Sequence, residues 1–290
     1  MMGISLAELK ADQRRRELYQ IKIKAPTFPT PLELSTYNSV RNEVSTPLLV
    51  WDALDKDMMF PKWVALSESG VAIGKCLGVV QTSPEELLAW MFLFDSNQSM
   101  AKHTKENGAD KHKYPNKLLS QINDHHIISY SCRKLPPPLA ARDWLTRNFW
   151  LKADEDTYVL IYKSVNNEES DFPQNLVRST IQNVVTGQFV SMYEFKRLPF
   201  GQTRFKMLAK ADIRGSVPKQ IANRAMSGVL DSVRRSYEFF EKDEEIDSLT
   251  RYGEQPPPHT FSLPLPYTLH SPNFLLPTNQ LIFFQNSLEI

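Results

Sequence analysis

Hydrophobic and polar residues alternate along six segments in the middle of the chain. An alternation with a period of two is typical of strands that bury one face. The last two segments are joined by Leu198–Gln202, where Pro199 and Gly201 are typical turn residues. Because short connections join antiparallel strands, the pattern predicts an antiparallel sheet. The predicted strands are Ile127–Cys132, Trp144–Leu151, Thr157–Ser164, Val177–Val185, Phe189–Arg197 and Thr203–Asp212.

Two segments of the same region have the hydrophobic period of a helix. Ser83 and Glu86 have the spacing of a capping box and precede an apolar helix predicted over Glu85–Phe94. A long helix is predicted from Pro218 to Asp243, with apolar residues at every fourth position. It would be about 39 Å long at about 1.5 Å per residue. A helix lying across a curved antiparallel sheet is an α+β arrangement.

The two ends of the chain differ from this middle region. Residues 1–46 are predicted to form a basic helix over residues 5–24 and then a proline-containing linker. That helix is either a solvated helix or a membrane-surface helix. Residues 47–247 are predicted to form one domain. Residues 248–290 are rich in proline and poor in charge, which predicts a disordered tail. The alternative is that this tail contains a short motif for a protein partner.

Composition excludes several classes of protein. The 34 basic and 33 acidic residues give a net charge of +1, which argues against a nucleic-acid partner. Two cysteines are too few for a disulfide scaffold. The longest apolar run, Leu87–Phe94, is too short to span a bilayer, and the charged N-terminal segment is not typical of a signal peptide. We therefore expect a cytoplasmic protein, with peripheral membrane contact left open.

The sequence contains no convincing catalytic or metal-binding pattern. His125 and His126 are adjacent but have no partners at zinc-ligand spacing, so we expect a surface or loop role for them. Cys132 lies in an alternating apolar strand, which predicts a buried structural thiol. With 10 glycines, phosphate-binding loops are scarce. We predict no catalytic residue, no metal site and no cofactor, and hence a protein that is not an enzyme.

Four segments in order resemble the START family, the lipid-transfer domains related to steroidogenic acute regulatory protein. Order and spacing agree over residues 70–242. The segments are Pro138–Trp144, which resembles the family's P-x-x-x-R-D-aromatic strand start, Thr157–Val165, Val177–Ser179, and Ala211–Lys219, which resembles its D-x-x-G-x-x-P-K segment.

The resemblance implies a helix-grip fold, in which a curved antiparallel sheet surrounds a hydrophobic cavity closed by the C-terminal helix. It also implies that one lipid (a sterol, phospholipid or sphingolipid) is bound without covalent chemistry. By position, the loop Val165–Leu176 would be the gating loop, with Phe172 and Pro173 at its centre. Asn148 stands where many members have a cavity-facing arginine, and the family's Trp-Asp after the first long helix is missing.

These features together predict noncatalytic binding of a single lipid, with transfer between membranes or sensing as the biological use. Adjacent strand residues face opposite sides, so we expect Arg142 and Asp143 to have structural roles with separate partners. The alternatives are a regulatory or interaction module with a filled cavity, and an enzyme, since related helix-grip folds include cyclases and hydrolases. The predicted lipid-facing residues are Trp144, Thr146, Asn148, Trp150, Phe205, Met207, Met226, Val229 and Leu230.

Overall fold

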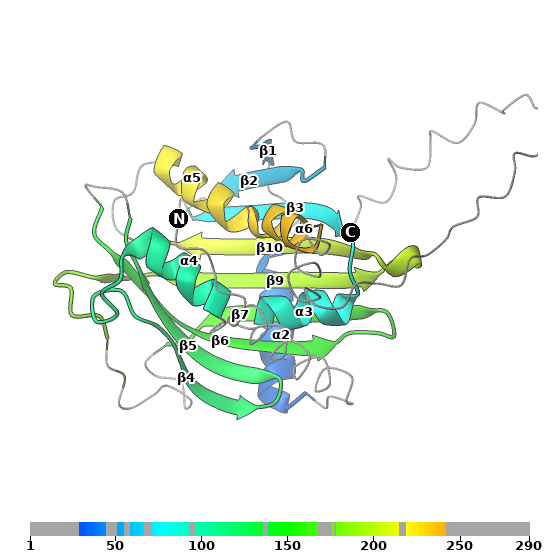
Figure 1. Ribbon diagram of the computed structural model, residues 1–290, viewed down its shortest axis with the longest axis horizontal. Coiled ribbons are helices and arrows are strands. Elements are labelled where there is room, and N and C mark those ends of the chain that lie inside the picture. The colour runs from blue at the N-terminus through cyan, green and yellow to red at the C-terminus, as the bar shows by residue number, and fades with distance from the viewer. Residues whose placement is uncertain are drawn as a thin grey trace, which may run out of the picture. The chain divides into compact units, whose positions relative to one another are not determined.

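One large antiparallel sheet organises the chain (Figure 1). The computed structural model describes residues 29–44, 51–54, 59–66, 71–92, 97–135, 139–166, 176, 178–214 and 219–241. Within them the strands are β1 (Asp52–Ala53), β2 (Lys62–Leu66), β3 (Ala72–Val80), β4 (Asn116–Asn123), β5 (His126–Arg133), β6 (Arg142–Lys152), β7 (Thr157–Ser164), β8 (Val185–Thr186), β9 (Gln188–Arg197) and β10 (Thr203–Asp212). The helices are α2 (Pro31–Val44), α3 (Pro84–Phe92), α4 (Asn97–Asn107), α5 (Lys219–Leu230) and α6 (Ser232–Phe240), with a 3₁₀ turn at Pro199–Gly201.

The strand order is β1-β2-β3-β10-β9-β7-β6-β5-β4, and β8 adds a short parallel pair to β6. The last strand, β10, therefore lies between β3 and β9 and joins the first strands to the rest. Five of the six predicted strands are confirmed, and β7 and β10 have the predicted bounds. The α+β helix-grip architecture is also confirmed.

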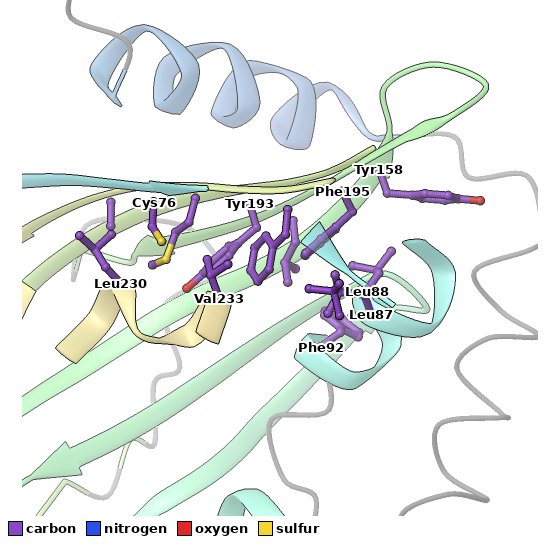
Figure 2. Packing of buried hydrophobic residues seen from close by; sticks show 14 of the residues in the cluster. Cys76, Leu87, Leu88, Phe92, Tyr158, Tyr193, Phe195, Leu230 and Val233 are labelled. Atoms are coloured by element: carbon purple, nitrogen blue, oxygen red, sulfur yellow. The ribbon is translucent and has the colours of Figure 1, made fainter. Parts of the chain in front are cut away.

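The period of two separates the side chains into two faces of the sheet. Helices α3, α4, α5 and α6 lie on one face, which we call the inner face, and α2 lies on the opposite, outer face (Figure 1). Figure 2 shows a buried apolar cluster between the inner face and the helices, with Leu87 and Leu88 of α3 and Val233 of α6 directed toward the sheet. The Ser83 cap of the predicted capping box is present, because the backbone N–H of Glu86 donates to Ser83 Oγ over 3.2 Å, while the Glu86 carboxylate accepts from Thr82 Oγ1 over 2.9 Å.

The C-terminal helix is not continuous, as the sequence predicted, but is divided into α5 and α6 at Asp231. The ψ angle of Asp231 is −7°, which opens the helical turn at this residue. Lys62 of β2 holds Asp231 through a 2.5 Å ion pair, with the lysine nearly completely buried. The division therefore follows from a contact with a strand distant in the sequence, which helical periodicity does not reveal.

The predicted strand over Val177–Val185 is wrong for the residues that the structure describes, since only Val185 belongs to a strand. The preceding residues bond to distant side chains and to the backbone of the loop before β4 instead of a neighbouring strand. The N–H of Ser179 donates to the Tyr130 hydroxyl over 3.0 Å, and Arg178 donates to Asp143 over 3.3 Å. Alternating apolar residues here cover the outer face of β5 and β6 as an irregular segment.

Helix α2 occupies a segment that the sequence analysis placed in the proline-containing linker. Its start is a reciprocal capping box, in which Thr30 N donates to Glu33 Oε2 over 2.7 Å and Glu33 N donates to Thr30 Oγ1 over 3.3 Å. Pro31 fits the first helical position, where no N–H is needed. The prolines therefore begin a helix here. The apolar side of α2, with Val40 and Val44, packs against β6, β7, β9 and β10.

The two adjacent histidines, expected at the surface or in a loop, are buried beneath α2. His125 and His126 donate to the two carboxylate oxygens of Glu33 over 3.1 and 2.8 Å, and Asn123 donates to the same carboxylate over 3.1 Å. Glu33 has no exposed surface. Burial alone would raise the pKa of Glu33, but the hydrogen bonds from Thr30, His125 and Asn123 outweigh it and lower the pKa to about 2.

Several predicted features lie outside the described residues. These are the N-terminal helix over residues 5–24, the proline-rich tail, and the centre of the gating loop at Phe172 and Pro173. Among the helices that the structure describes, none combines the length and apolar character required to cross a membrane.

Replacing Glu33 with glutamine should destabilise the domain. The Glu33→Gln change leaves His125 and His126 without their carboxylate, and breaking a buried pair of this kind costs about 3 kcal/mol of unfolding free energy. In the wild type, the contribution of Glu33 is complete above its ordinary pKa of 4.5 and is lost as the pH falls toward 2. Urea unfolding measured between these pH values should show this loss.

Glu43→Gln is the matched control, because Glu43 is a half-buried α2 carboxylate that accepts a 2.8 Å hydrogen bond from Lys210. It should change the unfolding free energy by less than about 1 kcal/mol. Equal losses in the two variants, or an unchanged acid dependence in Glu33→Gln, would contradict the assigned role of Glu33.

Candidate functional site

Apolar side chains from β3, β9 and β10 form a tightly packed part of the inner face. The rings of Phe195 and Phe205 lie 5.0 Å apart between centroids, and Tyr193 lies 5.9 Å from Phe205. Met207 is completely buried, and its sulfur accepts a hydrogen bond from Ser232 Oγ over 3.1 Å. This part of the face is therefore filled by side chains of the sheet and of α6.

Helices α5 and α6 approach β3 closely because glycines stand at the crossing points. A Cβ atom on Gly74 would lie 2.6 Å from the sulfur of Met226 and 3.0 Å from Leu230 Cδ1. A Cβ atom on Gly78 would lie 2.7 Å from Val233 Cγ1. Real Cβ atoms do not approach other heavy atoms this closely, so the missing side chains fix the distance between helix and sheet.

The structure brings most of the predicted lipid-facing residues together on the inner face. Trp150, Phe205, Met207, Met226 and Leu230 belong to one apolar cluster, with exposed fractions of 0 or 1%, and the half-buried Val229 packs at its border. A side chain without accessible surface contacts a ligand only if its neighbours move. These five residues therefore form the packed base of the site in this structure.

Thr146 and Asn148 belong to a polar group on the same face. Ser129 Oγ lies 3.1 Å from Thr146 Oγ1, and Asn148 Nδ2 donates to Ser129 Oγ over 2.8 Å. Trp144, at the start of β6, lies farther along and covers Gly187, whose Cβ would meet the indole nitrogen at 2.5 Å. Asn148 Oδ1 and Ser131 Oγ have no hydrogen-bond partner among the described residues.

Sequence reasoning missed two tyrosines at the centre of the inner face. Tyr162 of β7 and Tyr193 of β9 have ring centroids 5.5 Å apart, and the Tyr162 hydroxyl donates to the carbonyl of Met91 over 3.0 Å. Burial raises the pKa of both hydroxyl groups, so both remain protonated donors. The alternation of β7 and β9 already placed these residues on the inner side.

Arg142 and Asp143 have the separate structural partners that the sequence analysis predicted. Arg142 donates to the backbone carbonyls of Ile213, Arg214 and Ala140 over 2.6, 3.1 and 2.6 Å. Asp143 accepts a 2.8 Å hydrogen bond from the Tyr130 hydroxyl on the outer face. The pair therefore ties the start of β6 to the end of β10 and to β5.

Cys132 is a buried thiol, as predicted. It has no exposed surface and lies on the outer face with Ile128 and Tyr130. Burial raises the pKa of the thiol, and its thiolate, the nucleophilic form, is disfavoured at neutral pH.

A curved antiparallel sheet closed by C-terminal helices is the arrangement that the sequence resemblance implied. The sequence model of the START domain matches residues 60–246. The chain belongs to the START domain family. Members of this family generally bind or transfer lipids. In this START domain the match includes every described strand from β2 to β10, together with α3 to α6.

Solved structures with the same kind of fold are distant in sequence. Human STARD10 is 18% identical, covering 79% of this chain and 83% of that chain, with a TM-score of 0.49. The lipid transfer and protein localization domain of human StarD13 is 14% identical, with coverages of 74% and 98% and a TM-score of 0.48. A STAR-related lipid transfer protein from Xanthomonas axonopodis is 13% identical, with coverages of 67% and 97% and a TM-score of 0.48. No curated protein sequence matches the chain at a significant level.

A methyl group at Gly74 should separate α5 from the sheet. Gly74→Ala should lower the free energy of unfolding by about 1–3 kcal/mol, because Met226 and Leu230 have no free space into which to move. Chemical denaturation measures the loss. In the background of Met226→Ala, the same change should cost less, since the clashing atoms are absent.

Gly228→Ala is the control for replacing glycine with alanine. A Cβ atom there meets nothing within 4 Å, and the residue lies within α5. It should stabilise the domain by about 0.5–1 kcal/mol. If Gly74→Ala is also neutral or stabilising, β3 and α5 are not in the close contact described.

Proposed function

We propose that this START domain binds one lipid molecule between the inner face of β5, β6, β7 and β9 and helix α5. The observation that carries this proposal is a set of inner-face side chains that keep accessible surface beside the packed cluster. We call this set the open half of the inner face. It consists of the half-buried Trp144, Tyr162 and Phe189 of the sheet, with Val229 of α5 at the border of the packed cluster, while Ser131 and Thr146 beside them are buried.

Tyr162 supports the interpretation of this region as an enclosed space. Burial raises the pKa of its hydroxyl strongly, which means that protein surrounds the group. Judged by its accessible surface, the side chain is nevertheless only half-buried. Tyr162 therefore borders the accessible part of the inner face, which supports a ligand position there.

The chemistry of the open half suits an amphipathic ligand. Trp144, Phe189 and Val229 offer apolar surface, and each CH₂ group transferred from water to such a surface contributes about 0.8 kcal/mol. The Ser131 hydroxyl has no hydrogen-bond partner among the described residues, so a polar head can match it. A ligand with a chain and a polar head uses both kinds of surface.

The biological use follows as part of the same proposal. A bound lipid crosses water only while its apolar surface is covered, so loading and release require contact with a membrane surface. We propose a cytoplasmic protein that meets membranes peripherally and that transfers or senses a sterol, phospholipid or sphingolipid. Opening of the predicted gating loop, Val165–Leu176, would admit the lipid.

The second candidate is a regulatory or interaction module with a filled interior. It is favoured by the complete burial of Phe205, Met207 and Leu230, which leaves no accessible surface under this part of α5. In that case the open half would hold only water, and a protein partner, such as one bound by the proline-rich tail, would carry the function.

Filling the open half from α5 should prevent lipid uptake. Val229→Trp places a large side chain at the half-buried border of the cluster, so it should reduce the bound lipid at least tenfold. The measurement is native mass spectrometry of protein incubated with liposomes that contain sterol, phospholipid and ceramide. Circular dichroism should show an unchanged fold.

Arg224→Trp is the matched control, because Arg224 is exposed on the same helix. It should bind as much lipid as the wild type. Wild-type protein that contains no lipid after purification, and takes up none from these liposomes, would exclude the lipid-binding proposal and favour the regulatory module.

A further inference from the structure

Three basic side chains from distant parts of the sequence meet beside the open half of the inner face. Lys102 lies on α4, Arg133 ends β5, and Arg235 lies on α6. Arg133 is on the inner face, because β5 alternates and Ile127, an even number of residues away, belongs to the inner cluster. Glu106 lies within 4 Å of both Lys102 and Arg133, and Arg235 is within electrostatic range of both, so the three cations lie near one another.

Positive charge exceeds negative charge in this group. Glu106 Oε1 lies 3.8 Å from Lys102 Nζ, and Glu106 Oε2 lies 3.9 Å from Arg133 Nη1. Both distances exceed the reach of a hydrogen bond, so one carboxylate is shared loosely by two cations. Asp231 is also near Lys102, but Lys62 holds it at 2.5 Å. Among the described residues, three cations thus face one carboxylate that is not paired elsewhere, a local excess of +2.

The third cation adds to this excess without an acidic partner among the contacts described. Arg235 Nη1 donates to the carbonyl of Gly228 over 3.2 Å. Burial raises the pKa of Tyr193. The hydrogen bond with Ser191 lowers it, and the positive charges of Arg235 and Arg133 lower it further. The Tyr193 hydroxyl therefore lies within electrostatic range of both arginines and is a hydrogen-bond donor.

Lys102 and Arg133 are accessible, with 45% and 51% of their side chains exposed, and Arg235 is half-buried. Burial lowers the pKa of Lys102, and repulsion from Arg235 lowers it further. Burial also lowers the pKa of Arg133, although 51% of its side chain is accessible. Accessible cations that protein desolvates, and that repel one another, gain stability when an anion binds among them.

We propose that Lys102, Arg133 and Arg235 bind the anionic phosphate or carboxylate group of the lipid head, with Ser131 as a hydrogen-bond donor. The inference rests on the proposed function and gives it a ligand class, namely lipids with a net negative head group. Ser131 lies two residues before Arg133 on the same face of β5, and its hydroxyl has no partner among the described residues. The acyl chains would then lie along the open half.

The sequence analysis did not predict this anion site. The position where many START domains have a cavity-facing arginine is Asn148 here, and its side chain is completely buried against Ser129. The positive charge in this chain comes from the end of β5 and from two helices. It therefore lies at the rim of the inner face and not at its centre.

The test compares two lipids that differ only in the head. Delipidated full-length protein is mixed with liposomes that contain equal amounts of dioleoyl phosphatidic acid and dioleoylglycerol. The protein is then re-isolated, and the bound lipids are quantified by mass spectrometry. Wild-type protein should favour phosphatidic acid. Arg133→Gln and Arg235→Gln should each reduce the ratio of phosphatidic acid to diacylglycerol about tenfold, as the loss of a charge-assisted hydrogen bond predicts.

Glu106→Gln should act in the opposite direction. Removing the shared carboxylate raises the excess of positive charge, so the ratio should rise above that of the wild type. Damage to the fold does not produce such a gain. Arg224→Gln, at an exposed position of α5, is the control and should leave the ratio unchanged.

The outcomes separate this inference from the proposed function. Uptake of both lipids in equal amounts, or a ratio that neither arginine variant changes, would overturn the anion site and leave lipid binding intact. Uptake of neither lipid, and of none from the liposomes that contain sterol, phospholipid and ceramide, would overturn the proposed function. In that case, thermal unfolding in the presence of inorganic phosphate tests the anion site without a lipid. Stabilisation that is lost in Arg133→Gln supports a site for free phosphate, and no stabilisation overturns it.

Discussion

The close contact between the C-terminal helices and β3 is the constraint on which the rest of the structure depends. Gly74 and Gly78 let α5 and α6 lie directly on the strand, so that Met226 and Val233 fill the space where side chains would stand. Since β3 pairs with β10, this contact also joins the ends of the domain. The position of α5 in turn sets which part of the inner face is packed and which part stays accessible.

The inner face is consequently divided into two parts with different properties. Over β3 and β10, sheet and helix side chains interlock and leave no accessible surface at residues such as Phe205 and Met207. Over β6, β7 and β9, aromatic groups such as Trp144, Tyr162 and Phe189 stay only half-buried. The packed part supplies stability, and the accessible part supplies the chemistry on which the proposals rest.

The outer face of the sheet is covered in a different way, by a helix that a buried polar contact holds in place. Helix α2 places Glu33 over two buried histidines and joins the polar ends of β4 and β5 to its own first turn. Because the carboxylate accepts hydrogen bonds from four groups, its burial is tolerated and its pKa is low. A polar anchor of this kind fixes the helix in one position on an otherwise apolar surface.

The sequence by itself determined the antiparallel strands, the amphipathic C-terminal segment and the family, because periods of two and of about four residues and the D-x-x-G-x-x-P-K spacing are local properties. It did not reveal the capped helix α2, because Pro31 was interpreted as part of a linker. It also did not reveal the irregular course of Arg178–Val184, because the groups that bond to this segment are distant in the sequence. It predicted a set of inner-face residues but not which of them are packed. Only the tertiary structure decided that, and only it brought Lys102, Arg133 and Arg235 together, because charge proximity depends on how α4 and α6 cross the sheet.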